Sequence, residues 1–164
     1  MALQIWRFVT LMLTALLMSL AFAHVWQLSP RMDYSGPFWF QTLSMYREFG
    51  PGGPGPFVEV GALLSVVALA FWLRGRPAFA PTAFAALCLF TSFGLWWLFI
   101  DPVNVAMHHW TATSLPADWE AFRRRWEYAH AVRAALIALA FAALLASLLI
   151  ELSQRARRIV PRRL

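Results

Sequence analysis

The chain's most informative pattern reads Asp118-Trp119-Glu120-Ala121-Phe122-Arg123-Arg124-Arg125-Trp126-Glu127-Tyr128-Ala129-His130-Ala131-Val132-Arg133, and it runs without interruption into the apolar segment Ala134–Leu149. On a helix, Trp126, His130 and Arg133 share one face because they are spaced at i, i+4 and i+7. Glu127 precedes His130 by one helical turn, close enough to pair with it or to share a ligand. Ionisable groups are costly inside a bilayer, so this pattern predicts a polar site where a helix enters the membrane.

The composition indicates that lipid is the solvent for most of the chain. Its 164 residues are 60% hydrophobic with a mean hydropathy of +0.58, whereas soluble domains are about half apolar. A bilayer core needs about 20 residues of apolar helix, and four stretches are candidates, at about residues 5–28, 57–73, 78–100 and 129–152. We therefore predict an all-α fold, an integral membrane four-helix bundle that forms a single domain over residues 1–164.

The distribution of arginines predicts how the bundle is oriented. All 14 basic residues are arginines. In a four-span chain, one side receives arginines with almost no acids between them: Arg7, Arg74, Arg76, Arg155, Arg157, Arg158, Arg162 and Arg163. The arginines of the other side are interleaved with acids. The positive-inside rule therefore places both termini in the cytoplasm, as expected for a multi-pass protein of a bacterial inner membrane whose basic tail touches anionic lipid.

Several classes of function are excluded or disfavoured by the same features. The net charge of +6 is explained by membrane orientation, so we expect no nucleic acid partner. Cys88 is the only cysteine, which rules out a disulfide or a CxxC redox pair within the chain. A channel or transporter is disfavoured, because the sequence has no internal repeat and its spans have no interrupted, charge-bearing centre. Membrane lipid is the expected partner, and a homo-oligomer or a larger membrane complex stays open.

The first span has an alternative interpretation. Arg7, the apolar run after it and Ala21-Phe22-Ala23 together resemble a signal peptide with a cleavage site, and cleavage would leave His24 at the N-terminus. Because the apolar run continues through Leu28, we expect an uncleaved first span.

The outer connections carry two further expected features. Pro37–Phe49 has aromatic residues at roughly helical spacing and predicts a short interfacial helix. Gly50–Pro56 is too rich in glycine and proline to be helical. Pro116 suits the first position of the last helix, which would run to about Gln154 over roughly 58 Å and project above the bilayer. Within it, Glu120 is expected to pair with Arg124, and Arg123 with Glu127.

Histidines and carboxylates concentrate on the outer side of this topology. If the bundle brings the helix ends together, His24, Glu59 and His130 could converge. Two imidazoles and one carboxylate suit a non-haem metal, and two facing histidines suit a haem. The alternative is structural: Glu59 caps a helix, and Glu127, His130 and Arg133 tie the last helix to its loops. The cofactor therefore stays open between a metal ion, a haem and none.

Other residues of the outer side have candidate roles in ligand binding. Asn104 either caps the end of the third span or faces a ligand beside His130. Trp97, Trp110 and Trp126 lie at one depth together with Trp96 and could line a flat apolar pocket. His108 and His109 are interpreted as exposed loop residues.

The chain resembles a known family in these segments. Asp101-Pro102-Val103-Asn104 followed by Trp110, Pro116-Ala117-Asp118-Trp119 and Arg123–Arg133 are similar to the shared pattern of a bacterial and fungal four-span family that includes the fungal anthrone oxygenases. Three further stretches are similar to the bacterial branch of that family: Phe22-Ala23-His24-Val25, Tyr46-Arg47-Glu48-Phe49-Gly50 and Val58-Glu59-Val60. The resemblance implies the four-span fold, and it implies anthrone oxidation for the branch that serves polyketide pathways. Asn104, Trp126, His130 and Arg133 match the shared sequence pattern of the family, and the resemblance assigns them no individual roles.

Two functions follow as hypotheses. In the first, the protein is a membrane oxidoreductase that acts on a flat lipophilic substrate at the outer face. His130 then accepts a proton or binds a metal, Glu127 orients it, and Arg133 or Asn104 stabilises negative charge on an oxygen. In the second, the protein is a non-catalytic accessory or lipid-binding subunit, and the same cluster holds the outer loops together.

Overall fold

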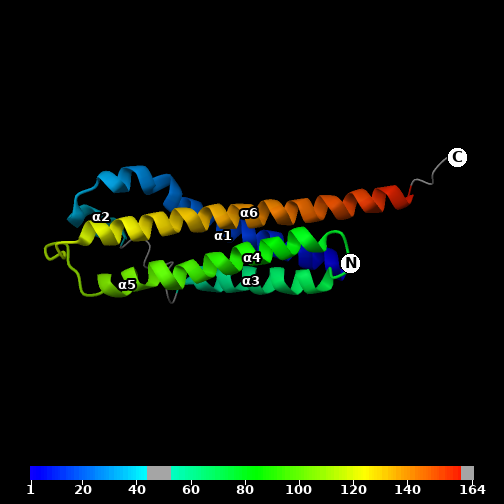
Figure 1. The fold of residues 1–164 in the computed structure, drawn as a ribbon, viewed down its shortest axis with the longest axis horizontal. Helices are drawn as coiled ribbons and strands as arrows, with labels where there is room; N and C mark the ends of the chain where they lie inside the picture. Colours follow the sequence, from blue (N-terminus) through cyan, green and yellow to red (C-terminus); the bar gives the residue numbers. More distant parts are fainter. Residues whose placement is uncertain (44–52, 160–164) are drawn as a thin grey trace.

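Four long helices form the whole framework of the molecule. The computed structural model describes residues 1–43 and 53–159, with side chains as far as Ala156. Four helical segments are long and apolar enough to cross a membrane, and they lie side by side in alternating directions (Figure 1). They are α1 (Ala2–Asp33), α3 (Pro54–Trp72), α4 with its extension (Phe79–Met107) and α6 (Trp119–Ile159). The predicted all-α membrane bundle is confirmed.

Different segments of the chain lie at the two ends of the bundle. The N-terminus, the C-terminal end of α6 and the α3–α4 turn lie together (Figure 1), and we call this the terminal end. In that turn Gly75 has a φ of 74°, a conformation that suits glycine. The opposite end, with α2 (Gly36–Leu43), α5 (Asp101–Met107) and residues 108–118, is called the loop end.

Small and branched side chains fill the space between the long helices. Ala62 and Val66 of α3, Ala85 of α4, and Ile137 and Ala140 of α6 are fully buried, and such small residues let membrane helices approach closely. Large apolar side chains are exposed on the outside of every span: Phe8, Leu16, Leu64, Phe71, Leu87, Phe90, Leu139 and Leu149. These faces contact lipid in a multi-pass membrane protein.

The third span continues past its predicted end through a π-helical turn. It was expected to stop at Ile100, before Asp101-Pro102, but α4 (Phe79–Leu95) leads into η2 (Trp96–Ile100) and then into α5. Pro102 has no N–H to donate to the Leu98 carbonyl, and the turn widens so that the Asp101 N–H bonds the Trp96 carbonyl. Arg125 of α6 donates to the Leu98 carbonyl at 2.6 Å instead. A side chain from a neighbouring helix thus replaces the missing backbone donor.

This replacement predicts a coupling between Arg125 and Pro102. Arg125→Ala removes the donor to Leu98 and is expected to lower the free energy of unfolding by about 1 kcal/mol. In a Pro102→Ala background, the new N–H at position 102 can bond the same carbonyl, so Arg125→Ala should cost clearly less there. The difference is measured with a double-mutant cycle, by unfolding the wild type, the two single variants and the double variant in mixed detergent micelles. Equal costs in both backgrounds would contradict the explanation.

The last helix begins three residues later than predicted. Pro116 and Ala117 stay outside α6, because the Trp119 N–H bonds the Pro116 carbonyl and the Ala121 N–H bonds the Asp118 carbonyl in a preceding turn. The 41 residues of α6 extend for about 61 Å at 1.5 Å per residue. This length exceeds a hydrocarbon core of about 30 Å, so the helix extends beyond the bilayer as expected.

The short helix of the first connection is present but packs differently from the prediction. α2 covers Gly36–Leu43, and the rest of the predicted segment, residues 44–49, lies outside the described residues. The stretch Gly50–Pro56 was expected to be non-helical, but α3 already begins at Pro54, because proline suits the first turn of a helix, where an N–H has no intrahelical acceptor. Residues 50–52 lie outside the described residues. Trp39 was expected to anchor this helix in the headgroup layer, but its side chain is fully buried against the bundle. α2 is therefore a cap on the loop end that contributes Trp39 and Leu43 to the core.

The close contact of this cap with α6 predicts that a larger residue at position 36 destabilises the protein. A Cβ atom there would lie 2.6 Å from Leu115 Cδ1 and 2.9 Å from Trp119 Cε2, so Gly36→Ala is expected to destabilise the protein by about 1–3 kcal/mol. Gly94→Ala is the control, because no heavy atom lies within 4 Å of the added methyl group. Within a helix the control should gain up to about 1 kcal/mol. Thermal unfolding in detergent tests whether the two changes have opposite signs.

Candidate functional site

A second core, separate from the one between the spans, lies at the loop end. Its buried members come from three parts of the chain: Trp39, Leu43, Ile100, Val103 and Trp126. Trp96, Trp110 and Trp119 are partly buried against it. The π-helical turn contributes here, because an extra residue in a turn rotates everything after it by about 100° relative to α4.

A pair of stacked histidines lies beside this core. The rings of His24 in α1 and His130 in α6 are nearly parallel, at 18°, with centroids 4.0 Å apart. Trp126 contacts both, with ring centroids 5.2 Å from His24 and 4.2 Å from His130. The expectation that the two histidines lie on the same side of the bundle is confirmed. His130 is 8% exposed, and its Nε2 has no hydrogen-bond partner among the described residues.

Glu127 is fixed by residues other than His130. Its Oε1 accepts a hydrogen bond of 2.9 Å from Trp39 Nε1 and lies 3.5 Å from Arg31 Nη1. Both side chains of this ion pair are almost completely buried. Within the described part of the chain, Oε2 of Glu127 has no hydrogen-bond partner. One carboxylate oxygen is therefore structural, and the other is left for a proton or a ligand.

Arg123 does not form the ion pair that helical spacing predicted. Its Nη1 donates to the carbonyls of Tyr34, at 2.7 Å, and Arg31, at 3.3 Å. Both carbonyls lie where α1 ends; the Arg31 carbonyl also accepts the Tyr34 N–H at 3.4 Å. The guanidinium also lies over the Trp119 ring, 4.6 Å from its centroid. Arg123 therefore caps α1, whereas the predicted pair of Arg124 and Glu120 is confirmed at 3.5 Å.

Arg133 joins three spans. Its Nε donates to the Ser92 carbonyl at 3.0 Å and lies 3.3 Å from Ser92 Oγ. Its Nη2 forms an ion pair with Glu59 of α3. Charged groups within spans are stable when they pair inside the bundle. Glu59 thus neither caps its helix nor joins the histidines, but balances the charge of Arg133.

The remaining predicted site residues are only partly brought together. Asn104 Oδ1 accepts a hydrogen bond of 2.9 Å from Trp126 Nε1, which places this amide next to the histidine pair through one indole ring. Trp110 packs against the loop-end core. Trp97 is 55% exposed and faces away from that core, in contact with Trp96 and Phe93.

The structure also shows where the loop histidines lie and how the predicted metal ligands are arranged. His108 and His109 are exposed, as expected. Among residues 1–43 and 53–159, no group of three or more His, Cys, Asp or Glu side chains is arranged to hold a metal ion. Ring nitrogens donate their lone pairs in the plane of the ring, and the stacked rings of His24 and His130 present their faces to each other. The arrangement of His24, Glu59 and His130 as three ligands of one metal is not found.

Sequence reasoning missed two residues that build this site. Trp39 and Arg31 hold Glu127, and both are buried. The signal for Arg31 was available, because Gln27 one turn earlier offers it an oxygen, and the bond is present at 2.8 Å. Trp39 offered no such signal, since its partner lies 88 residues away.

Four spanning helices that hold a stacked histidine pair and a buried carboxylate at one end define a membrane protein with a polar site at its helix ends. The family model described as anthrone oxygenase matches residues 53–143, more than half of the 164-residue chain. The chain therefore belongs to the anthrone oxygenase family, as the resemblance implied. The matched segment includes Glu127 and His130, whereas His24 precedes it. No curated protein and no solved structure matches the chain.

Proposed function

We propose that the protein is a membrane oxygenase that oxidises a flat lipophilic substrate at the loop end of the bundle. The observation that carries the proposal is the buried Nε2 of His130, which has no partner in the described part of the chain although the ring is held between His24 and Trp126. A buried polar atom without a partner is costly and calls for a role. A neutral imidazole in such a position is suited to accept a proton.

The family description suggests the class of substrate. An anthrone is a planar tricyclic ketone, and its central methylene group is acidic because the conjugate base is an aromatic oxyanion. Oxidation by O2 converts this CH2 group to C=O and releases H2O. Both C–H bonds break, one oxygen atom enters the product and the other leaves as water, so atoms and electrons balance with O2 as the only oxidant.

The residues of the site divide this work as follows. His130 accepts the proton from the methylene group through Nε2, and His24 supports the ring by stacking on it. Asn104, whose Oδ1 is occupied by Trp126, and Arg133 stabilise the oxyanion. The Oε2 atom of Glu127, which has no hydrogen-bond partner in the described part of the chain, is available to a proton. Trp126 and Trp110 provide an aromatic surface for the substrate. Trp97 would meet a substrate that approaches through the lipid.

The test is oxygen consumption by the purified protein with an anthrone as substrate. One O2 consumed for each quinone formed is expected, above the rate of spontaneous oxidation. Absorption spectra and metal analysis of the same sample decide whether a haem or metal takes part. If quinone forms no faster than in an equal concentration of empty micelles, the accessory-subunit hypothesis is favoured.

We also propose that the terminal end faces the cytoplasm of a bacterial inner membrane, which puts the candidate site at the outer face. The support is the arginine-rich composition of that end and the positive-inside rule. Single cysteines at Ser35 and Thr113, both exposed at the loop end, should react with a membrane-impermeant thiol reagent added to intact spheroplasts. The buried Cys88 is expected to stay unlabelled. Protection of either introduced cysteine until the membrane is opened would contradict this orientation.

A further inference from the structure

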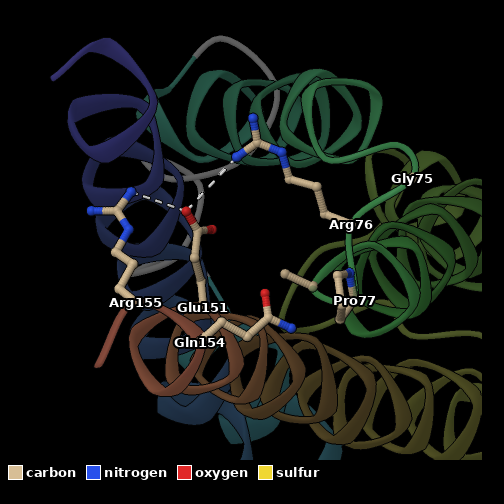
Figure 2. A pocket seen from close by; sticks show the side chains of 7 residues that line it. Gly75, Arg76, Pro77, Glu151, Gln154 and Arg155 are labelled. Atoms are coloured by element: carbon tan, nitrogen blue, oxygen red, sulfur yellow. Dashed lines mark hydrogen bonds and ion pairs between the residues drawn. The ribbon is translucent and has the colours of Figure 1, made fainter. Parts of the chain in front are cut away.

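A separate cluster of charged side chains lies at the terminal end, far from the histidine pair. Glu151 of α6 is its centre, and three guanidinium groups approach the carboxylate. Arg7 of α1 forms an ion pair with it, Arg155 lies 3.1 Å away, and Arg76 of the α3–α4 turn lies 3.9 Å away. Figure 2 shows Arg76 and Arg155 converging on this carboxylate from different elements.

The cluster carries an excess of positive charge. Three arginines share one carboxylate, so two positive charges are not balanced by any acid in the cluster. Arg7 is almost completely buried, and its Nε has no hydrogen-bond acceptor among the described residues. The side chains of Arg76 and Arg155 are 50% and 48% exposed. Glu151 therefore holds the guanidinium groups together without neutralising them, and two of them remain open to a ligand.

A cavity opens beside these arginines. It has a volume of about 460 Å³. It is lined by Gly75, Arg76, Pro77, Ala78, Glu151, Gln154 and Arg155. The Gln154 amide reaches toward the opening between Glu151 and Pro77 (Figure 2) and adds a neutral donor to the charged ones. The lining thus offers donors on several sides of a space large enough for a phosphate group with its substituents.

The position of the cavity along the spans indicates where its ligand comes from. α3 ends at Trp72 and α4 begins at Phe79, so the cavity lies at the depth where the spans leave the hydrocarbon. Phe71, Trp72 and Phe79 are exposed around this end, and such aromatic residues are typical of the membrane interface. A headgroup that enters the cavity could leave its acyl chains on these apolar surfaces.

We propose that this cavity binds the phosphate group of an anionic phospholipid, with Arg76 and Arg155 as its direct ligands. Guanidinium groups bind phosphate oxygens in pairs of parallel hydrogen bonds. Glu151 positions both arginines, and Gln154 donates to a further oxygen. The site is specific, in contrast to the general contact of the spans with lipid, and it is independent of the oxygenase chemistry at the other end.

Lipid binding by the purified full-length chain tests the proposal. Phosphatidylglycerol added to the protein in a neutral detergent is expected to be retained in native mass spectra and to raise the melting temperature, whereas phosphatidylcholine does so much less. Arg76→Gln with Arg155→Gln should weaken phosphatidylglycerol binding by about 10- to 30-fold, since an arginine near an anionic surface contributes about one factor of five. Each single variant should show an intermediate loss, which keeps the test usable if the double variant folds poorly.

Arg124→Gln is the matched control. Its side chain is 53% exposed and pairs with Glu120 at 3.5 Å at the opposite end, so it removes the same charge without touching the cavity. It should bind phosphatidylglycerol like the wild type. A shift produced by inorganic phosphate alone, and lost in the same double variant, would support the site and assign it to free phosphate. Equal lipid binding by the double variant and the wild type would overturn the proposal.

Discussion

His130→Ala is expected to lower the rate of anthrone oxidation at least about 100-fold, the usual contribution of a general base. The Nε2 of His130 is buried and has no hydrogen-bond partner in the described part of the chain, so the loss of this imidazole removes the proposed proton acceptor. The protein should still fold, because α6 gains a strong helix former at that position. Quinone formation measured against the yield of monodisperse protein separates the two effects.

Two further variants make this result specific. His109→Ala removes an exposed loop histidine and should leave the rate unchanged. His24→Ala removes the ring that stacks on His130 and is expected to cause a smaller loss, because it takes away support and not the base itself. If His130→Ala lowers the yield of folded protein while the remaining protein oxidises anthrone at the wild-type rate, the histidine pair is structural and the accessory-subunit hypothesis gains support.

The sequence predicts the architecture well because the relevant signals are local. Runs of apolar residues of sufficient length predict four helices, and an even number of spans brings both termini to one end, as in Figure 1. The pairing of Glu120 with Arg124 follows from helical spacing alone. The meeting of His24 and His130 could also be predicted, because each lies near the loop end of its span and ionisable groups turn inward in lipid.

What the sequence could not predict depends on packing between distant segments. Glu59 lies 74 residues from Arg133 and Trp39 lies 88 residues from Glu127, so no periodicity relates them. From the sequence, Trp39 resembles an interfacial anchor, because an aromatic residue on a short amphipathic segment can either lie in the headgroup layer or be buried in a core. The continuation of the third span past Pro102 needed the donor from Arg125, which only the packed structure supplies.

The largest expected effect on stability is at Glu127. Glu127→Ala should lower the free energy of unfolding by about 3–5 kcal/mol, the cost of breaking a buried ion pair by removing one partner. The change leaves the buried guanidinium of Arg31 without this carboxylate and the indole N–H of Trp39 without its acceptor. Both groups are almost completely buried, so water cannot easily replace the lost oxygen. Unfolding in mixed detergent micelles measures the effect.

Glu120→Ala is the control for this prediction, because Glu120 also pairs with an arginine but is exposed and makes only a local pair within α6. Glu120 lies on the same helix and pairs with Arg124 at 3.5 Å, the same distance that separates Glu127 from Arg31, but its side chain is 55% exposed. An exposed pair contributes about 0.3–0.5 kcal/mol on a helix. Glu127→Gln should fall between the two, since an amide oxygen can still accept from Trp39 although the charge opposite Arg31 is gone. If Glu127→Ala and Glu120→Ala cost the same, the loop end is hydrated in solution and the buried network does not hold α2 and α1 on α6.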